Sequence, residues 1–377
     1  MNIKQCDDWN KNPTINPKTG RTIKINGPTY SILKKECSKW HENRINIGKD
    51  IKKQLGKIKI TQWNMCMSGK NAPSFRKKFT DIKWIGAGGF GQVYKAKIGS
   101  NELVIKEALI FDDDLLKMKK SKQAYPREYT MMKYANDLLI TKKCPNFLYT
   151  YSLATCHGCQ MIYQNKIGTC FVAFMEPAKY DLAQMLKSEQ QTPVQNLLYQ
   201  LLIALHAIQK YYSIFHRDIK RQNILIKEIP KFGYLKYIID GEVFLVKNLG
   251  YLAILSDFGL AKSLSPGTRK VEVIFDKLKP IKSQNELIDN QRFPPFEFFY
   301  DIQDLIRMFY GGKKMSQPGS HLPIKPIDPV FLNKLKLYGY LDTNITARYF
   351  LAKLMLRALY TAPLDFNIEI FDTYIMN

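Results

Sequence analysis

The sequence predicts an α+β protein with two lobes, the first rich in β-strands and the second helical, preceded by a small N-terminal module. Apolar and polar residues alternate over residues 81–108 around glycine-containing turns, which is typical of strands. The segments at 126–139 and 192–212 have the apolar spacing of helices. Residues 1–45 contain two Asn-Pro pairs and a Thr-Gly pair that mark turns, and one short helix is expected at 29–37 (TYSILKKEC), which together indicate a separate, turn-rich module.

The composition is that of a globular protein, with 45% apolar and 24% charged residues in a chain of 377. The apolar run LLYQLLIALHAI at 197–208 is too short to span a bilayer, so we expect a buried helix and no transmembrane segment. The first residues lack a basic-then-apolar leader, so we expect no export. Seven cysteines, an odd number, argue against a disulfide framework and favour a reducing compartment.

Positive charge is concentrated near the N-terminus. Residues 1–80 contain 18 Lys and Arg against 5 Asp and Glu, and so carry 13 of the 24 net positive charges. Such a region attracts acidic proteins or nucleic acid, although the same charge could serve solubility alone. Residues 46–78 are Lys-rich with scattered apolar positions, which predicts a basic linker.

Three polar side chains of different chemistry lie close together in FHRDIKRQNILI, residues 215–226. Asp218, Lys220 and Asn223 supply a carboxylate, an ammonium and an amide within six residues. Downstream, Asp257 begins the tripeptide DFG directly after the strand-like YLAIL and Ser256, a position suited to a metal ligand. Either motif alone could occur by chance.

A glycine-rich stretch and a lysine precede these motifs. Residues 86–93 fit the pattern G-x-G-x-x-G-x-V, and glycines let a backbone approach phosphate oxygens closely. Lys106 lies in an apolar strand and needs an anionic partner if it faces inward. Glu128 is the natural partner, because Glu107 adjoins the lysine and points to the opposite face. A plain hairpin turn and a solvated lysine are the alternatives.

In this order, the four elements resemble those of a eukaryotic-type protein kinase, over about residues 79–310. The resemblance implies a bilobal protein-kinase fold at 79–377, with a β-rich N-lobe and a helical C-lobe. It also implies ATP-dependent transfer of the γ-phosphoryl group to protein hydroxyls.

The resemblance implies a role for each matching residue. Asp218 would orient the substrate hydroxyl and accept its proton, while Lys220 would stabilise charge on the transferring group. Asn223 and Asp257 would hold Mg²⁺. Lys220 also predicts a serine/threonine kinase, because a lysine two residues after the catalytic Asp accompanies that class.

The same resemblance implies an ATP-binding set. Lys106, held by Glu128, would contact the α- and β-phosphates. Backbone groups at Glu176 and Ala178 would bind adenine, with Met175 at the rear of the pocket. The glycine-rich motif would cover the phosphates through Gly86, Gly88, Gly91 and Val93.

The chain departs from the family in several places. Asp218 and Asp257 are 39 residues apart, and the extra residues at about 229–252 predict an inserted β-hairpin turning at Asp240-Gly241. Kinases of large nucleocytoplasmic DNA viruses are similar at this point. The usual A-P-E triplet is altered to residues 295–297 (PFE), and Asp301 or Asp304 suits the family's core helix.

A phosphorylated activation segment could pair with Arg217. The available hydroxyls are Ser263, Ser265, Thr268 and Ser283.

Residues 1–45 resemble the 2-cysteine adaptor domain of proteins from such viruses, including iridovirus-like kinases. The match includes Cys6, Trp9, Tyr30 and Cys37 and suggests partner binding, although the cysteines could be plain core residues. Cys156 and Cys159 have metal-ligand spacing without a second pair, so we expect ordinary thiols rather than zinc.

The sequence therefore predicts an active serine/threonine kinase that uses ATP and Mg²⁺ and acts on proteins in the host cytoplasm or in the virion. One alternative is a pseudokinase-like scaffold that binds partners through the basic N-terminus. Another is a small-molecule phosphotransferase of kinase-like fold. The presence of Lys106, Asp218, Asn223 and Asp257 favours the active kinase.

Overall fold

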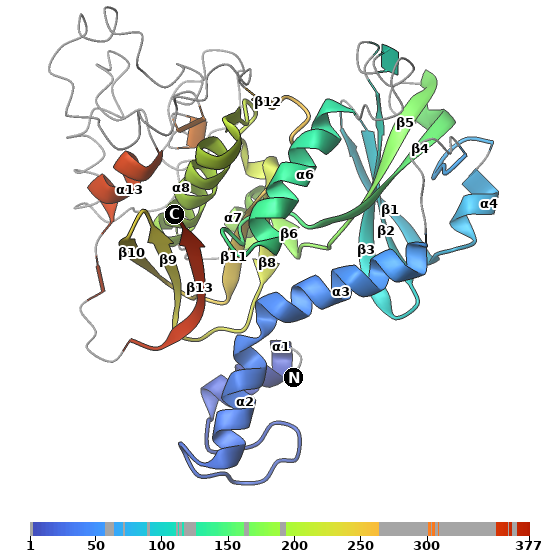
Figure 1. The fold of residues 1–377 in the computed structure, drawn as a ribbon. Coiled ribbons are helices and arrows are strands. Elements are labelled where there is room, and N and C mark those ends of the chain that lie inside the picture. Colours follow the sequence, from blue (N-terminus) through green and yellow to red (C-terminus); the bar gives the residue numbers. More distant parts are fainter. Residues whose placement is uncertain are drawn as a thin grey trace, which may run out of the picture. The chain divides into compact units, whose positions relative to one another are not determined.

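The computed structural model separates the chain into two compact units, drawn in Figure 1. The sheet lobe comprises residues 39–140 and 148–178, and the helix lobe comprises residues 1–38, 141–147 and 179–377. The structure describes residues 3–56, 64–70, 72–88, 91–110, 112, 115–116, 126–161, 166–188, 194–263, 301–302, 304–305, 308, 352–360, 362–363 and 368–377.

The sheet lobe contains a five-stranded antiparallel sheet in the order β1-β2-β3-β5-β4. Buried and half-buried positions alternate along the second strand, in agreement with the alternation expected from the sequence. Helix α6 (Arg127–Ile140) packs against β4. The strands are β1 (Thr80–Gly88), β2 (Gly91–Ile98), β3 (Asn101–Leu109), β4 (Thr150–Met161) and β5 (Lys166–Met175).

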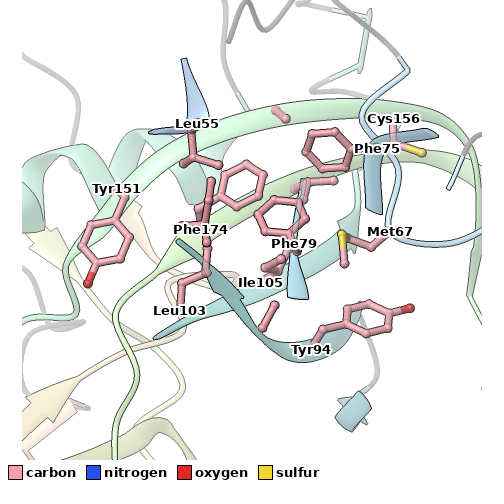
Figure 2. Close-up of a cluster of buried hydrophobic side chains, with 14 of the residues drawn as sticks. Leu55, Met67, Phe75, Phe79, Tyr94, Leu103, Ile105, Tyr151, Cys156 and Phe174 are labelled. Atoms are coloured by element: carbon pink, nitrogen blue, oxygen red, sulfur yellow. The ribbon is translucent and has the colours of Figure 1, made fainter. Parts of the chain in front are cut away.

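The basic linker expected at 46–78 is corrected by the structure over its described residues. Helix α3 (Trp40–Leu55) packs on β4, and α4 (Ala72–Arg76) follows it. Ile51 and Leu55, four residues apart on one face of α3, join the hydrophobic core of the sheet lobe. Figure 2 shows Leu55 among the other side chains of this core. The numerous lysines concealed this short apolar stripe in the sequence pattern.

The cysteine prediction was wrong for six of the seven residues. Cys144 is buried and is not disulfide-bonded, whereas the others form the disulfides Cys6–Cys37, Cys66–Cys156 and Cys159–Cys170. The sulfurs of Cys156 and Cys159 are therefore neither ordinary thiols nor available as zinc ligands. Spacing along the chain could not reveal these pairs, because strand pairing and the bridge between Asn64 and Cys156 bring distant segments together.

The helix lobe is organised around α8 (Val194–Tyr212), whose residues 197–209 are all buried. This confirms the buried helix predicted at 197–208, and no helix among the described residues is long and apolar enough to cross a membrane. A three-stranded sheet has the order β11-β8-β6. The other elements are β6 (Tyr180–Asp181), α7 (Leu182–Ser188), β7 (Ile214–Phe215), β8 (Ile224–Glu228), β11 (Tyr251–Leu255) and β12 (Lys262–Ser263).

An antiparallel hairpin lies where the sequence predicts an insertion. Strands β9 (Tyr234–Ile239) and β10 (Glu242–Lys247) pair around Asp240 and Gly241, whose φ angles are 50° and 80°. Two positive φ angles at a two-residue turn match the twist of antiparallel strands. The strand β13 (Ile370–Met376) extends the pair by parallel contact with β9, and α13 (Ala352–Leu359) packs on α8.

The N-terminal module packs within the helix lobe. Helices α1 (Ile3–Lys11) and α2 (Pro28–Ser38) are joined by the Cys6–Cys37 disulfide around a small buried cluster. The Phe232 ring packs against this cluster, and Lys34 forms an exposed ion pair with Glu369 at 2.8 Å.

A buried carboxylate anchors the loop after β7. Asp301 accepts the backbone N–H groups of His216 at 2.6 Å and of Arg217 at 2.7 Å. Of the two core-helix aspartates that the sequence offers, Asp301 therefore makes this contact. Burial raises the pKa of Asp301 to about 7, although the two N–H donors act in the opposite direction.

We predict that Leu55→Ala lowers the free energy of unfolding by about 2–5 kcal/mol, because it leaves a cavity in the core of the sheet lobe. Ile47→Ala is the matched control, because Ile47 lies on the same helix and is 46% exposed; its expected effect is within about 0.5 kcal/mol. Chemical denaturation measures both. Equal, small effects would mean that α3 does not belong to the core.

We also predict that the stability contributed by Asp301 falls as the pH rises. Its folded pKa of about 7 exceeds the ordinary 3.8, so the folded protein holds this proton more tightly between about pH 4 and pH 7. The free energy of unfolding of the wild type should therefore decline with pH over this window relative to that of Asp301→Asn. Denaturation at several pH values compares the slopes, and parallel curves would contradict the raised pKa.

Candidate active site

Pairing of β8 with β11 brings two candidate metal ligands together. The register pairs Ile224 with Leu255, so Asn223 directly precedes one end of the ladder and Asp257 lies two residues beyond it. Ser256 fastens this end, since its N–H and its hydroxyl donate to the Asn223 carbonyl at 3.1 and 2.9 Å. The inserted residues leave from the other end of the ladder, between Glu228 and Tyr251, and do not disturb this geometry.

The Asp218 carboxylate is the centre of the polar cluster predicted from the sequence. Lys220 Nζ lies 2.6 Å from Asp218 Oδ2. The amide nitrogen of Asn223 donates to the same oxygen at 2.9 Å and to the Asp218 carbonyl at 2.8 Å. The 3₁₀ turn Arg221–Asn223 folds the loop back so that these contacts are possible. The Asp218 side chain remains 23% exposed, which leaves it accessible to a substrate hydroxyl.

His216 supports this loop, a role that was not predicted from the sequence. Its ring is fully buried and lies 5.0 Å from the ring of Phe258. Burial lowers the pKa of His216, which favours the neutral ring. In the tautomer that fits both contacts, Nε2–H donates to the Ser256 carbonyl at 2.9 Å, and Nδ1 accepts the Asp218 N–H at 3.3 Å.

Two residues of the site have left-handed backbone conformations that side chains disfavour. The φ angle is 68° at Arg217 and 63° at Asp257. Neighbouring interactions hold both conformations. The Asp301 carboxylate accepts the Arg217 N–H, and the β8–β11 ladder ends two residues before Asp257. Such strained backbone conformations cluster at functional sites, because an ordinary loop relaxes to a more favourable φ angle.

In the sheet lobe, Lys106 and Glu128 form the predicted ion pair. Lys106 Nζ lies 2.5 Å from Glu128 Oε1, and the two side chains are 14% and 9% exposed. On β3 the lysine lies opposite Val93 of β2. Glu107 points to the other face, as predicted, and is completely buried.

The glycine-rich motif joins β1 to β2. Gly88 pairs with Gly91 at the end of the two strands, and residues 89–90 lie outside the described part. A Cβ on Gly91 would meet the Glu107 carbonyl oxygen at 2.6 Å, so strand packing itself requires this glycine. A Cβ on Gly86 would meet nothing within 4 Å, so packing does not explain that residue.

The adenine-binding segment predicted after β5 is held by an interaction that sequence reasoning missed. Glu176 turns its side chain into the sheet lobe, where it pairs with Arg44 of α3. Its N–H donates to the Tyr149 carbonyl at 2.9 Å, and Ala178 is half-buried. Arg44 lies in a region that was expected to be outside the catalytic unit, and no local motif indicated that it pairs with Glu176.

Some predicted residues cannot be placed. Ser265, Thr268, Ser283 and the triplet at 295–297 lie outside the described residues. Ser263 is described, in exposed β12, and its hydroxyl donates to the Tyr212 carbonyl at 3.3 Å. The remaining candidates form two groups, with Lys106 and Glu128 in the sheet lobe and the Asp218 cluster in the helix lobe.

The donor atoms near the β8–β11 ladder fit a magnesium ion. Both hydrogen bonds of the Asn223 side chain use its nitrogen, which leaves the amide oxygen for a metal. Asp257 supplies a half-buried carboxylate. Mg²⁺ prefers oxygen ligands and is bound in enzymes by one or two protein groups together with phosphates and water.

Comparisons with known proteins match two parts of the chain to families. Residues 5–39 match the 2-cysteine adaptor domain, and residues 79–277 match the protein kinase domain. The first match covers the disulfide-linked helices α1 and α2. The second covers more than half of the chain and includes every candidate catalytic and metal-binding residue.

The similar proteins include two viral kinases. "Probable serine/threonine-protein kinase 380R" of Invertebrate iridescent virus 6 is 33% identical, covering 72% of this chain and 63% of that protein. The candidate serine/threonine-protein kinase 019R of Frog virus 3 (isolate Goorha) is 25% identical, covering 74% of this chain and 43% of that protein. The chain thus spans less than two thirds of the length of each relative.

A third similarity is short. The candidate ubiquitin thioesterase 232R of Invertebrate iridescent virus 6 is 54% identical over 33 residues, which make up 9% of this chain and 5% of that protein. The extended match at 79–277 is the one that identifies the family: the chain belongs to the protein kinase domain family.

Proposed function

We propose that this chain is an ATP- and Mg²⁺-dependent serine/threonine protein kinase. The observation that carries the proposal is the Asp218 cluster, in which Lys220 and Asn223 both contact one oxygen of a partly exposed carboxylate within 2.9 Å. Phosphoryl transfer depends on positioning and charge neutralisation, and this cluster offers both.

Asp218 has the central role in the proposed mechanism. Its carboxylate would accept a hydrogen bond from the substrate hydroxyl, direct the oxygen towards the phosphorus atom and take its proton. Asn223 holds the carboxylate through contacts to its side chain and its carbonyl, so the group needs little reorganisation before it acts. Burial lowers the pKa of His216, which favours an uncharged ring next to the loop.

The two lysines would act on negative charge. Lys220 would stabilise the charge that develops on the transferred group. Lys106, oriented by Glu128, would contact the α- and β-phosphates. Asn223 and Asp257 would hold magnesium, which when bound neutralises phosphate charge. The backbone at Glu176 and Ala178 would bind adenine, and the glycine-rich turn from Gly86 to Val93 would cover the phosphates.

Lys220 supports serine or threonine as the target. The chain carries the lysine that accompanies this class in the kinase family, and both viral relatives are named as serine/threonine kinases. Each proposed catalytic group is present, and no described contact favours the pseudokinase-like scaffold.

A basic docking region and the location of the protein stay predictions. The excess of positive charge in residues 1–80 supports salt-sensitive binding to an acidic protein or nucleic acid. The host cytoplasm and the virion both stay proposed locations. The three disulfides are typical of oxidising surroundings, in contrast to the reducing compartment expected from the cysteine count.

We predict that Asp218→Asn lowers kcat by about 10²–10⁴-fold, because the hydroxyl loses its proton acceptor. The protein should still fold and bind ATP. Labelled ATP, Mg²⁺ and a panel of acidic and basic proteins provide the assay, followed by phosphosite mapping.

Gln222→Ala is the control, because Gln222 lies in the same loop and is exposed; its activity should stay within about twofold of the wild type. Near-normal turnover by Asp218→Asn would refute the assignment. A preponderance of phosphotyrosine would refute the target class.

We further predict that Lys106 and Glu128 act on one step. Lys106→Ala should lower kcat/KM by about 100-fold, and Glu128→Ala should cost less, because it removes only the orientation of the lysine. The kcat/KM of the double variant should be little lower than that of Lys106→Ala alone, since the effects of residues that act as one unit are not additive. If the losses in kcat/KM of the two single variants add up in the double variant, Glu128 does not act through Lys106.

A further inference from the structure

A buried ion pair joins α3 to the segment that follows β5. Arg44 Nε donates to Glu176 Oε2 at 2.9 Å, and a second guanidinium nitrogen contacts Oε1. The side chains are only 3% and 1% exposed. The planar guanidinium thus binds both carboxylate oxygens, a geometry that fixes the orientation of the partner more strongly than a single contact.

The same carboxylate is tied to Tyr149, the residue that directly precedes β4. Glu176 Oε1 accepts the Tyr149 N–H at 2.9 Å, and the Glu176 N–H donates to the Tyr149 carbonyl at 2.9 Å. Glu176 is therefore held through its backbone and its side chain together. These contacts restrict the torsions that determine where the backbone groups of residues 176–178 point.

Close packing sets the distance between α3 and Tyr149, which precedes β4. A Cβ on Gly48 would lie 2.2 Å from Tyr149 Cε1, so only glycine permits the observed approach. The Lys52 ammonium lies 5.3 Å from the centre of the same ring. The helix cannot move closer to the Tyr149 ring, and the buried ion pair opposes its moving away.

The segment after α3 makes a second contact, next to Lys106. The buried Glu107 carboxylate accepts the Met67 N–H at 2.8 Å and the Ser68 hydroxyl at 2.5 Å. Gln92 of β2 donates to the same carboxylate at 2.9 Å. These donors hold the strand at the residue beside the proposed phosphate-binding lysine.

A covalent link and apolar packing hold this second contact in place. Cys66 is disulfide-bonded to Cys156 of β4. Leu55 and Met67 share one buried cluster with Ile105 and Phe174 of the sheet (Figure 2). We call residues 40–56 and 64–68 the N-terminal clasp. This clasp is attached to the sheet by α3 and again at residues 66–68.

We propose that the N-terminal clasp, described at residues 40–56 and 64–68, is part of the nucleotide-binding apparatus, with Arg44 as a positioning residue for the backbone at Glu176 and Ala178. The clasp precedes the residues that match the protein kinase domain, which begin at residue 79. It is therefore an addition to the matched domain. The inference rests on the proposed function, from which the adenine contacts are taken.

The test is the affinity of the full-length chain for adenosine, which carries the base without phosphates. Arg44→Met should raise the Kd for adenosine and the KM for ATP by about tenfold, because the adenine-binding backbone loses its orientation. The kcat of the folded protein should change by less than about twofold, since the Asp218 cluster is untouched. A purely structural role for Arg44 would lower the folded fraction and leave both Kd and KM unchanged.

Two further variants separate positioning from folding. Arg44→Met alone leaves the buried Glu176 carboxylate without its cationic partner, which can impair folding. Combining it with Glu176→Gln removes that charge, so the double variant should recover thermal stability while its adenosine Kd stays at least about fivefold raised. Arg44→Lys retains the charge with one contact, and its Kd should be intermediate.

Lys95→Gln is the matched control, because it breaks the exposed Lys95–Glu102 ion pair of the same lobe and should leave the adenosine Kd unchanged. Calorimetry measures every Kd without a phosphorylation assay. Wild-type affinity in the folded Arg44→Met/Glu176→Gln variant overturns this inference alone. A wild-type chain that binds neither adenosine nor ATP overturns the proposed function, and this inference with it.

Discussion

The pairing of β8 with β11 is the constraint on which the catalytic arrangement depends. One end of this ladder determines the positions of Asn223 and Asp257, and its connection through Ser256 ties the two loops to each other. Asp218 then takes its position from Asn223 and from the loop that Asp301 anchors. The ladder also explains why a long insertion is harmless, because the extra residues leave from its opposite end, and loop length costs little when the ends remain fixed.

Much of this site could be predicted from the sequence, because its chemistry is local. Asp218, Lys220 and Asn223 lie within six residues, so a short motif contains the entire cluster. The Lys106–Glu128 pair could also be predicted, since a lysine facing inward on an apolar strand needs an anion and Glu128 lies in the following segment with helical spacing. The turn of the hairpin could be expected at Asp240-Gly241, because both residue types tolerate positive φ angles.

The parts that could not be predicted depend on contacts between distant segments. The disulfide of Cys66 joins residues 90 positions apart. An odd number of cysteines does not show whether such pairs form. Arg44 and Glu176 are 132 residues apart, and an arginine among many basic residues suggests solvent exposure rather than a buried pair. The apolar stripe of α3 is only a few residues long, so its lysines dominated the pattern and indicated a linker. Composition describes a segment, whereas burial depends on its neighbours.

The strand β13 has a consequence for how the chain acquires its structure during synthesis. It pairs in parallel with β9, although about 130 residues separate the two strands in the chain. The hairpin of β9 and β10 can form as soon as residue 247 has left the ribosome, but one edge of β9 then has no partner until residues 370–376 follow. At about 5–20 residues per second, this delay is on the order of ten seconds. During that interval β9 presents an open strand edge, which is the feature through which nascent chains pair with wrong partners.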